Sequence, residues 1–284
     1  FGVVAALWLV WVPLLFHKRS RNHPGVLKLV CVLVPVVLTF AAGIAAARLS
    51  PSGSFARVSP STGFWLSWLW SFGVYTLVGQ RTVQSSVLLL LTALVLILGA
   101  NFGFFSSLSL FKEYTAQTKT FWTAFGQHLF LAGTASVIGT VAGVLLGWAA
   151  WKGIRVRQAV FFVLNAVQTL PSLALFGLLI IPLAALGWGG IGTAPALVAL
   201  SLYAAFPITR STLTALQALD PAVLEAGRGL GFGPWNSFVQ LQFPLALPAV
   251  LDGLRTASVQ AVGNTVVAAL IGAGGFGSLI FLGL

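Results

Sequence analysis

Charged residues are scarce in this sequence, and acidic residues are the scarcest of them. Charged side chains make up 7% of the 284 residues, hydrophobic side chains make up 58%, and Asp and Glu together number only 4. Soluble domains carry about 25% charged residues, so water cannot be the main solvent of this chain. The composition excludes an ordinary soluble domain and indicates a protein embedded in lipid.

Residues that build disulfides, metal sites and nucleotide sites are missing as well. The sole cysteine, Cys31, lies in an apolar run, and His, Asp and Glu form no cluster with the spacing of a metal or catalytic site. A disulfide framework, a bound metal and a membrane-embedded enzyme are therefore not expected. The chain also lacks the Gly-x-x-x-x-Gly-Lys-Ser/Thr loop that holds nucleotide phosphates, so it is not expected to bind a cofactor itself.

What the sequence has in abundance is apolar runs close to the roughly 20 residues that a helix needs to cross a bilayer. These runs lack the period-2 alternation of a membrane barrel, so we predict an all-α, polytopic transmembrane helical bundle. The length criterion predicts about eight crossings. The predicted spans are 1–16, 26–47, 64–79, 85–105, 126–151, 158–182, 191–209 and 245–271.

The net charge of +11 comes from 15 basic residues against 4 acidic ones. In a soluble protein this balance would suggest nucleic acid as a partner. Here most basic residues fall in short gaps between apolar runs, as the positive-inside rule expects of cytoplasmic loops, so no nucleic-acid partner is expected. The loops assigned to the cytoplasm are 17–25 with Lys18, Arg19 and Arg21, 80–84 with Arg81, 152–157, and 210–244.

The two ends of the sequence are unusual for a membrane protein built of full spans. Methionine is absent and Phe1 already lies inside an apolar run, so we expect the natural N-terminus to lie upstream. Strict alternation places the glycine-rich stretch 271–277 outside, and 278–284 is too short to cross. Either a final helix is missing, or this stretch is re-entrant and packed within protein, because bare backbone cannot face lipid.

The two halves of the chain differ in the polar residues that they place at membrane depth. Residues 1–120 indicate an N-terminal region of generic spans, whereas 121–284 contain prolines, amides and glycines within the apolar runs. Function is therefore expected in 121–284. In its first span, small residues recur every fourth position and form one smooth helix face, suited to close packing within the chain or against a second subunit. They are Ala135, Gly139, Gly143 and Gly147.

Polar residues interrupt the predicted span 158–182. They are Asn165, Gln168, Thr169, Pro171 and Ser172. Buried amides are costly in hydrocarbon unless they are paired or face water, and Pro171 frees a carbonyl one turn earlier. This indicates either a proline kink repaired by its polar neighbours or a helix that lines a translocation path. No cluster of buried carboxylates accompanies it, which disfavours ion-coupled transport, and Asp252 and Arg255 could pair locally one turn apart.

The segment 220–244 is too polar to span a membrane and too patterned to be a linker. Asp220 followed by Pro221 predicts a helix start, because Asp caps the first turn and proline presets its first residue. This helix should stop in the glycines that follow, and Pro234 should open a second short helix that ends before Pro244. Such a pair of short helices suits the cytoplasmic surface.

The spacing inside this segment resembles the EAA loop of ABC-importer permeases. In that loop Glu-Ala-Ala is followed after three residues by Gly, and after nine more by Ile-x-Leu-Pro. The matching residues are Glu225, Ala226, Gly231, Leu241 and Pro244, with Gly227, Leu241 and Phe243 as mild departures. The resemblance implies that 220–244, opened by Asp220 and Pro221, forms the coupling helices that dock on a cytoplasmic ATPase. The alternative is an interfacial elbow in which Glu225 only pairs with Arg228.

Four stretches resemble the osmoprotectant permeases, which import glycine betaine, choline and related quaternary amines. They are Gln127-His128-Leu129, 165–174, Asp220-Pro221-Ala222 and 269–277. The resemblance covers about 121–284, and the spans before it resemble a subgroup with an extended N-terminal membrane region. An amino-acid-like solute is the alternative cargo, and an ATP-independent secondary transporter is the alternative mechanism.

The resemblance implies a type I importer permease, multi-pass in the bacterial inner membrane, and it implies partners. These are a cytoplasmic ATPase dimer that binds ATP and Mg, a second permease subunit, and a periplasmic or lipid-anchored substrate-binding protein. The candidate path residues are Asn165, Gln168, Pro171, Ser172 and Tyr203. A quaternary ammonium cargo offers no hydrogen-bond donor, so aromatic faces must attract it. The aromatic candidates are Trp148, Trp188, Tyr203 and Phe206, with a core or interfacial role as the alternative.

Overall fold

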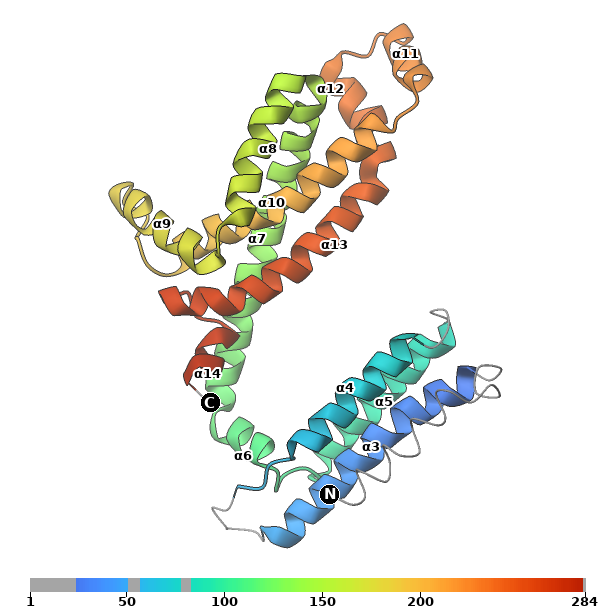
Figure 1. Cartoon of the computed structure of the whole chain (residues 1–284), viewed down its shortest axis with the longest axis vertical. Helices are drawn as coiled ribbons and strands as arrows, with labels where there is room; N and C mark the ends of the chain where they lie inside the picture. Colours follow the sequence, from blue (N-terminus) through green and yellow to red (C-terminus); the bar gives the residue numbers. More distant parts are fainter. Residues whose placement is uncertain (1–23, 51–56, 78–82, 283–284) are drawn as a thin grey trace. The chain divides into compact units, whose positions relative to one another are not determined.

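The computed structural model describes residues 24–50, 57–77 and 83–282, which fall into two compact units, 1–117 and 118–284. Every regular element in these described ranges is helical, and the only β-type contact there is an isolated bridge between Val58 and Leu108 (Figure 1). The predicted all-α fold is confirmed. The predicted span 1–16 lies outside the described residues, as do Lys18, Arg19, Arg21 and Arg81 of the predicted cytoplasmic loops.

In the described residues of the first unit there are three apolar helices and a short one. They are α3 (Pro24–Leu49), α4 (Thr62–Leu77), α5 (Val83–Asn101) and α6 (Ser109–Ala116). Helix α3 lies against both α4 and α5, and its Leu27 and Cys31 are buried in one cluster with Val74 and Tyr75 of α4. Helix α6 occupies a stretch that the apolar pattern left as a loop, and its Glu113 forms an exposed ion pair of 2.9 Å with Arg57.

The second unit is built around one central helix. Its elements are α7 (Thr118–Lys152), α8 (Ile154–Thr169), α9 (Ser172–Ala185), α10 (Thr193–Gln217), α11 (Pro221–Gly229), α12 (Pro234–Ser237), a π turn (Phe238–Gln242), α13 (Phe243–Ala268), a 3-10 turn (Ala269–Ile271) and α14 (Phe276–Leu282). Helix α10 packs against α7, α8, α9 and α13. In its most apolar stretch 61% is buried, against 39% in α7, so α10 is the core helix of this unit.

The glycine ladder of α7 packs against α10. Gly139 faces Ala204 of α10, and Gly143 faces Ile208 so closely that a Cβ added to Gly143 would lie 2.8 Å from the Ile208 Cβ. Gly147 faces Thr212 in the same way, one turn further along. The ladder therefore serves packing within the chain, which was one of the two alternatives that the sequence left open.

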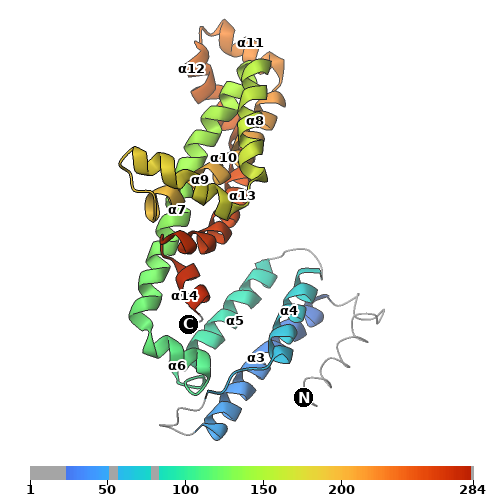
Figure 2. The same ribbon diagram turned by 60° about the vertical axis from the view of Figure 1, so that its left-hand side comes forward.

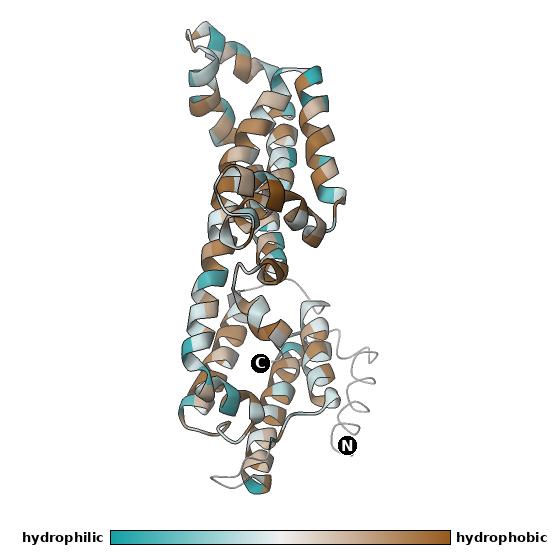
Figure 3. Cartoon of the chain, turned by 90° about the vertical axis from the view of Figure 1, so that its left-hand side faces the viewer, coloured by the Kyte–Doolittle hydropathy of each residue, from teal (hydrophilic) through white to brown (hydrophobic). Residues whose placement is uncertain are grey.

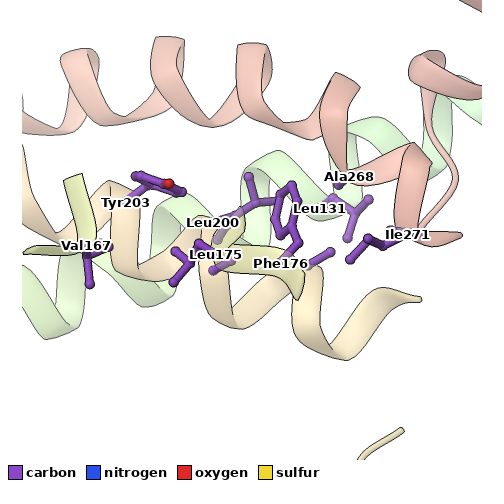
Figure 4. Close-up of a cluster of buried hydrophobic side chains, with 12 residues drawn as sticks. Leu131, Val167, Leu175, Phe176, Leu200, Tyr203, Ala268 and Ile271 are labelled. Atoms are coloured by element: carbon purple, nitrogen blue, oxygen red, sulfur yellow. The ribbon is translucent and has the colours of Figure 1, made fainter. Parts of the chain in front are cut away.

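A buried apolar cluster fills the space where α7, α9, α10 and α13 meet (Figure 4). Phe176 of α9 and Leu200 of α10 are fully buried in it, and Leu131 of α7 is 1% exposed. Ala268 and Ile271, at the end of α13 and in the turn after it, complete the cluster. This cluster anchors α9 to the helices that follow it.

Outward faces of the helices are strongly apolar. Phe162, Ile181 and Val259 are each more than 70% exposed, and hydrophobic residues recur along the long helices (Figure 3). Four helices in the described ranges are long and apolar enough to cross a membrane, and a bent pair, α8 with α9, would make a fifth. Helices α4 and α5, at 16 and 19 residues, are shorter than those four, so the described residues supply four to five of the eight predicted spans.

Two predicted spans have different limits in the structure. The span 158–182 is broken at Leu170 and Pro171 into α8 and α9, which are bent by 112°. The reason is Pro171, which has no N–H for a continuing helix and disfavours helical geometry in the residue before it. The span 191–209 continues as α10 to Gln217, because Thr212 and Leu216 are buried and extend its packing surface.

Candidate functional site

The segment 220–244 lies at one end of the second unit, and α14 lies toward the other end (Figure 1, Figure 2). Asp220 caps α11 as predicted: its Oδ1 accepts a 2.9 Å hydrogen bond from the Ala222 N–H, and Pro221 is the first helical residue. This satisfies one of the backbone N–H groups that a helix start leaves without a partner. The residue at which α11 begins is thus set by its own sequence.

Gly231 ends α11 because of its backbone conformation. Its φ is +79°, in the left-handed region that glycine adopts without strain. The Phe232 N–H donates to the Gly227 carbonyl at 3.0 Å, and the Gly231 N–H donates to the Arg228 carbonyl at 2.9 Å. These two bonds form a Schellman turn, which closes the last carbonyls of the helix. The presence of glycine at position 231, one of the residues that match the EAA loop, is therefore explained by the backbone turn that ends α11.

The second half of the segment differs from the prediction. Helix α12 does not end before Pro244 but continues through the π turn into α13, so that Pro234–Ile271 forms one helical rod. In the π turn the Phe243 N–H donates to the Phe238 carbonyl, five residues back. The widened turn lets the rod pass Pro244, which has no N–H to donate and would clash in a regular helix.

Packing ties the segment to the membrane helices. A Cβ on Gly227 of α11 would lie 2.5 Å from Leu241 Cδ1, so α11 sits directly on the π turn. The rings of Trp148, at the end of α7, and Phe238 lie 4.7 Å apart, and Trp235 contacts both. The segment is therefore in close contact with α7 and with the rod that continues into α13.

The outward surface of the segment is open. Glu225, Ala226 and Arg228 are exposed, and Leu230 and Trp235 are 73% and 56% exposed. Within the described ranges, Glu225 forms no ion pair with Arg228. Nor does Asp252 pair with Arg255, contrary to the local pairing considered from the sequence. The carboxylate of Glu225 is therefore available to a partner.

Inside the unit, two of the five candidate path residues meet. The Gln168 Nε2 donates to the Tyr203 carbonyl at 2.9 Å, and the Tyr203 hydroxyl donates to the Leu170 carbonyl at 2.6 Å. The Gln260 Nε2 donates to the Gln168 Oε1 at 3.2 Å, so α8, α10 and α13 are joined. We call Gln168, Tyr203 and Gln260 the interior brace. The other candidates are outside it: Asn165 and Pro171 are exposed and Ser172 is half-buried.

Sequence reasoning missed Gln260. Its signal was available, because an amide in the apolar span 245–271 is as unusual as the one at Gln168. Gln260 lies mostly among small and apolar residues, with a second amide, Asn264, four positions further on, whereas Gln168 lies near Asn165 and Pro171. Pro171 marks the span of Gln168 as irregular, whereas no proline lies within a turn of Gln260.

Most of the aromatic candidates are engaged within the chain. The Lys152 Nζ lies 3.5 Å from the ring centre of Trp148, so this ring already has a cation. Phe206 packs edge-on against Phe161, and the Tyr203 hydroxyl belongs to the interior brace. Trp188, in the loop after α9, is 66% exposed. Among these four rings, Trp188 has the face open to a ligand.

Two stretches of the matched pattern come together near α14. The Gly275 N–H donates to the Gln127 Oε1 at 3.0 Å, and the rings of His128 and Phe276 lie 5.3 Å apart. Gly272, Gly274 and Gly275 all have positive φ, which turns the chain back after α13. The stretch 271–277 is thus packed against α7, as expected for backbone sheltered from lipid.

Comparison with known families gives matches along most of the chain. Residues 139–284 match the family described as binding-protein-dependent transport system inner membrane component. Residues 1–111 match the N-terminal domain of the ABC transporter permease YehY.

Individual relatives match over more than half of the chain. The osmoprotectant import permease protein OsmW of Salmonella typhimurium is 44% identical over 162 residues, which cover 56% of this chain and 73% of that protein. The glycine betaine/carnitine/choline transport system permease protein OpuCB of Bacillus subtilis is 38% identical over 159 residues, 56% of this chain and 70% of that protein. Among solved structures, an inward-facing form of the MetNI methionine ABC transporter aligns with a TM-score of 0.53 at 22% identity, over 58% of this chain and 80% of that one. This last likeness shows a shared fold.

Proposed function

Since the chain belongs to the family of binding-protein-dependent transport system inner membrane components, we propose that it imports a quaternary ammonium osmoprotectant, such as glycine betaine or choline, as the permease subunit of an ATP-driven importer. The chain is a multi-pass inner-membrane protein, and members of its family work with an ATPase and a substrate-binding protein. We assign transport to residues 121–284. The observation that carries the proposal is the exposed two-helix segment 220–244 on a chain of this family.

The proposed role of this segment is to couple the chain to the ATPase. Glu225 and Arg228 offer unpaired charges, and Leu230 and Trp235 offer apolar surface beside them. Together they supply the apolar centre and charged rim of a protein interface. ATP and Mg²⁺ belong to the ATPase, because this sequence lacks a phosphate-binding loop. The chain itself performs no chemistry.

Movement reaches the membrane helices through rigid parts. Helix α11 is closed at both ends by its own hydrogen bonds, so it moves as one body. Its contact with Leu241 passes a push to the rod Pro234–Ile271, and the ring contacts of Trp148 pass it to α7. A short rigid helix transmits such a displacement, whereas a flexible loop would absorb it.

The proposed cargo class rests on the relatives. OsmW is named for osmoprotectant import and OpuCB for transport of glycine betaine, carnitine and choline. The chain adds one supporting feature, the exposed face of Trp188, because a quaternary ammonium is attracted by aromatic faces. Selection of the cargo is assigned to a periplasmic or lipid-anchored substrate-binding protein, and a second permease subunit, the same or homologous, completes the path.

Reconstitution tests this function. The chain is placed in proteoliposomes with its ATPase and binding protein, and uptake of radiolabelled glycine betaine is measured with ATP, without ATP and without the ATPase. We expect uptake only when all components and ATP are present. Uptake that persists without ATP would show a secondary transporter and overturn the proposal. Uptake of an amino acid in place of glycine betaine, choline and carnitine would overturn the cargo class.

A further inference from the structure

Two prolines leave backbone carbonyls of the second unit without their helical partners. In α10, residue 207 should donate its N–H to the Tyr203 carbonyl, but Pro207 has none. At the bend between α8 and α9, the chain leaves helical geometry at Leu170, so no continuing helix supplies a donor to the Leu170 carbonyl. An unpaired carbonyl at membrane depth is costly, so each needs a donor from elsewhere.

Gln168 and Tyr203 supply these donors reciprocally. Gln168 donates its Nε2 to the carbonyl that Pro207 frees, and Tyr203 donates its hydroxyl to the carbonyl at the bend. A carbonyl can only accept, so the Gln168 carboxamide must turn its NH₂ toward Tyr203. Its Oε1 then points away and needs a donor of its own. Gln260 provides that donor from α13.

We propose that Gln260 is a positioning residue of the translocation path, which fixes the Gln168 carboxamide and so holds the bend between α8 and α9 to α10. This inference rests on the proposed function, because it takes the bend to be part of the path. Gln260 also lies on the rod Pro234–Ile271, whose first residues, Pro234 and Trp235, belong to the exposed segment 220–244. Displacement of that rod by the ATPase therefore acts on the bend through the amide of Gln260.

The first test replaces the donor. Gln260→Leu keeps the size of the side chain and removes its hydrogen bond, and Val259→Ala, on the neighbouring lipid-facing position, is the matched control. In the assembled transporter we expect backbone hydrogen exchange across 166–176 to rise about fivefold in Gln260→Leu, the scale of one interhelical hydrogen bond in a membrane. We expect the maximal rate of glycine betaine uptake to fall about fivefold with KM changed less than twofold, because the proposed role of Gln260 is to hold Gln168 and not to bind cargo. If exchange and uptake match those of Val259→Ala, the proposal is overturned.

The second test removes the need for the brace. Pro207→Ala restores an N–H that can donate to the Tyr203 carbonyl, so the Gln168 bond becomes dispensable. In this background Gln260→Leu should raise exchange less than about twofold, a non-additive result expected of residues in one network. Additive effects would show that Gln260 acts only through its volume and would overturn the proposal. If the Gln260→Leu variant does not assemble into the transporter, both tests are done with the Gln260→Met variant.

The exchange readout separates this inference from the proposed function. Absence of glycine betaine uptake in the unaltered transporter would count against the proposed cargo or mechanism. Exchange across 166–176 needs no cargo, so it still decides whether Gln260 holds the bend.

Discussion

The segment 220–244 and the interior brace both interrupt regular helices, and they satisfy the freed backbone groups in opposite ways. In the segment every partner is close in sequence: Ala222 bonds to Asp220, and Phe232 bonds to Gly227. In the brace the partners are 33, 35 and 92 residues apart and come from α8, α10 and α13. The local hydrogen bonds make α11 rigid by itself. The interior brace makes a joint whose geometry depends on the positions of α8, α10 and α13.

The two arrangements respond differently to a displacement. A locally closed helix keeps its shape when it is pushed, so it suits a contact with a moving partner. A joint formed by side chains from three helices changes when one of those helices shifts. The rod Pro234–Ile271 connects the two regions, since it begins in the segment and carries Gln260.

The largest expected effect comes from the exposed region alone. Glu225→Lys should weaken binding of the ATPase by about 2–5 kcal/mol, at least roughly thirtyfold in affinity, if this carboxylate meets a buried partner there. Copurification and titration of the ATPase measure it, with Asp252→Lys as a matched charge reversal on α13. Backbone hydrogen exchange across 166–176, which contain Gln168 of the interior brace, should stay unchanged. Equal losses in both variants would show that net charge, not the segment, governs binding.

The packing that supports both regions is the next target. Gly143→Val should destabilise the chain by about 2 kcal/mol, because the added atoms meet Ile208 and the Ala205 carbonyl within 3 Å. Thermal unfolding in detergent measures the loss. Gly133→Val on the same helix is the control, since a Cβ there meets nothing within 4 Å. Similar losses of stability in Gly143→Val and Gly133→Val would contradict the close packing of the glycine ladder of α7 on α10.

Gly231→Ala tests whether the segment is closed locally. The left-handed conformation costs an L-residue about 1–2 kcal/mol, although no atom obstructs the added methyl group. Amide exchange within 221–232 should rise about tenfold, while exchange across the brace stays the same. Gly233→Ala, at a φ of −66°, is the control and should have no such effect. A change that spreads to the brace would mean that the two regions are not separable.

Tyr203→Phe should have the smallest effect. It removes the hydroxyl that donates to the Leu170 carbonyl and leaves the buried ring in place. The expected loss is about 0.6–1 kcal/mol, the usual size of one interhelical hydrogen bond in a membrane. Exchange across 166–176 should rise while exchange across 221–232 does not. No change at the bend would argue that the Leu170 carbonyl finds another donor.

Sequence reasoning succeeded where partners are local. Asp220 with Pro221 predicted the start of α11, and the glycines from Gly229 to Gly233 predicted its end, because caps and glycine turns depend on the few residues around them. At Pro171 the sequence allowed a kink but not its size, and the predicted helix end before Pro244 was wrong. One becomes a bend of 112° and the other is passed by a π turn, and this outcome depends on what neighbouring helices supply.

Local patterns in the sequence were enough to identify a helical membrane protein with one short, locally capped helix, α11, outside its spans, because hydrophobicity and capping act over a turn or two of helix. Only the tertiary structure decided that the glycine ladder of α7 packs on α10 and that Gln260 completes the brace around Gln168 and Tyr203. Those contacts join residues far apart in the chain. Their pairing is set by how helices cross, which no local pattern contains.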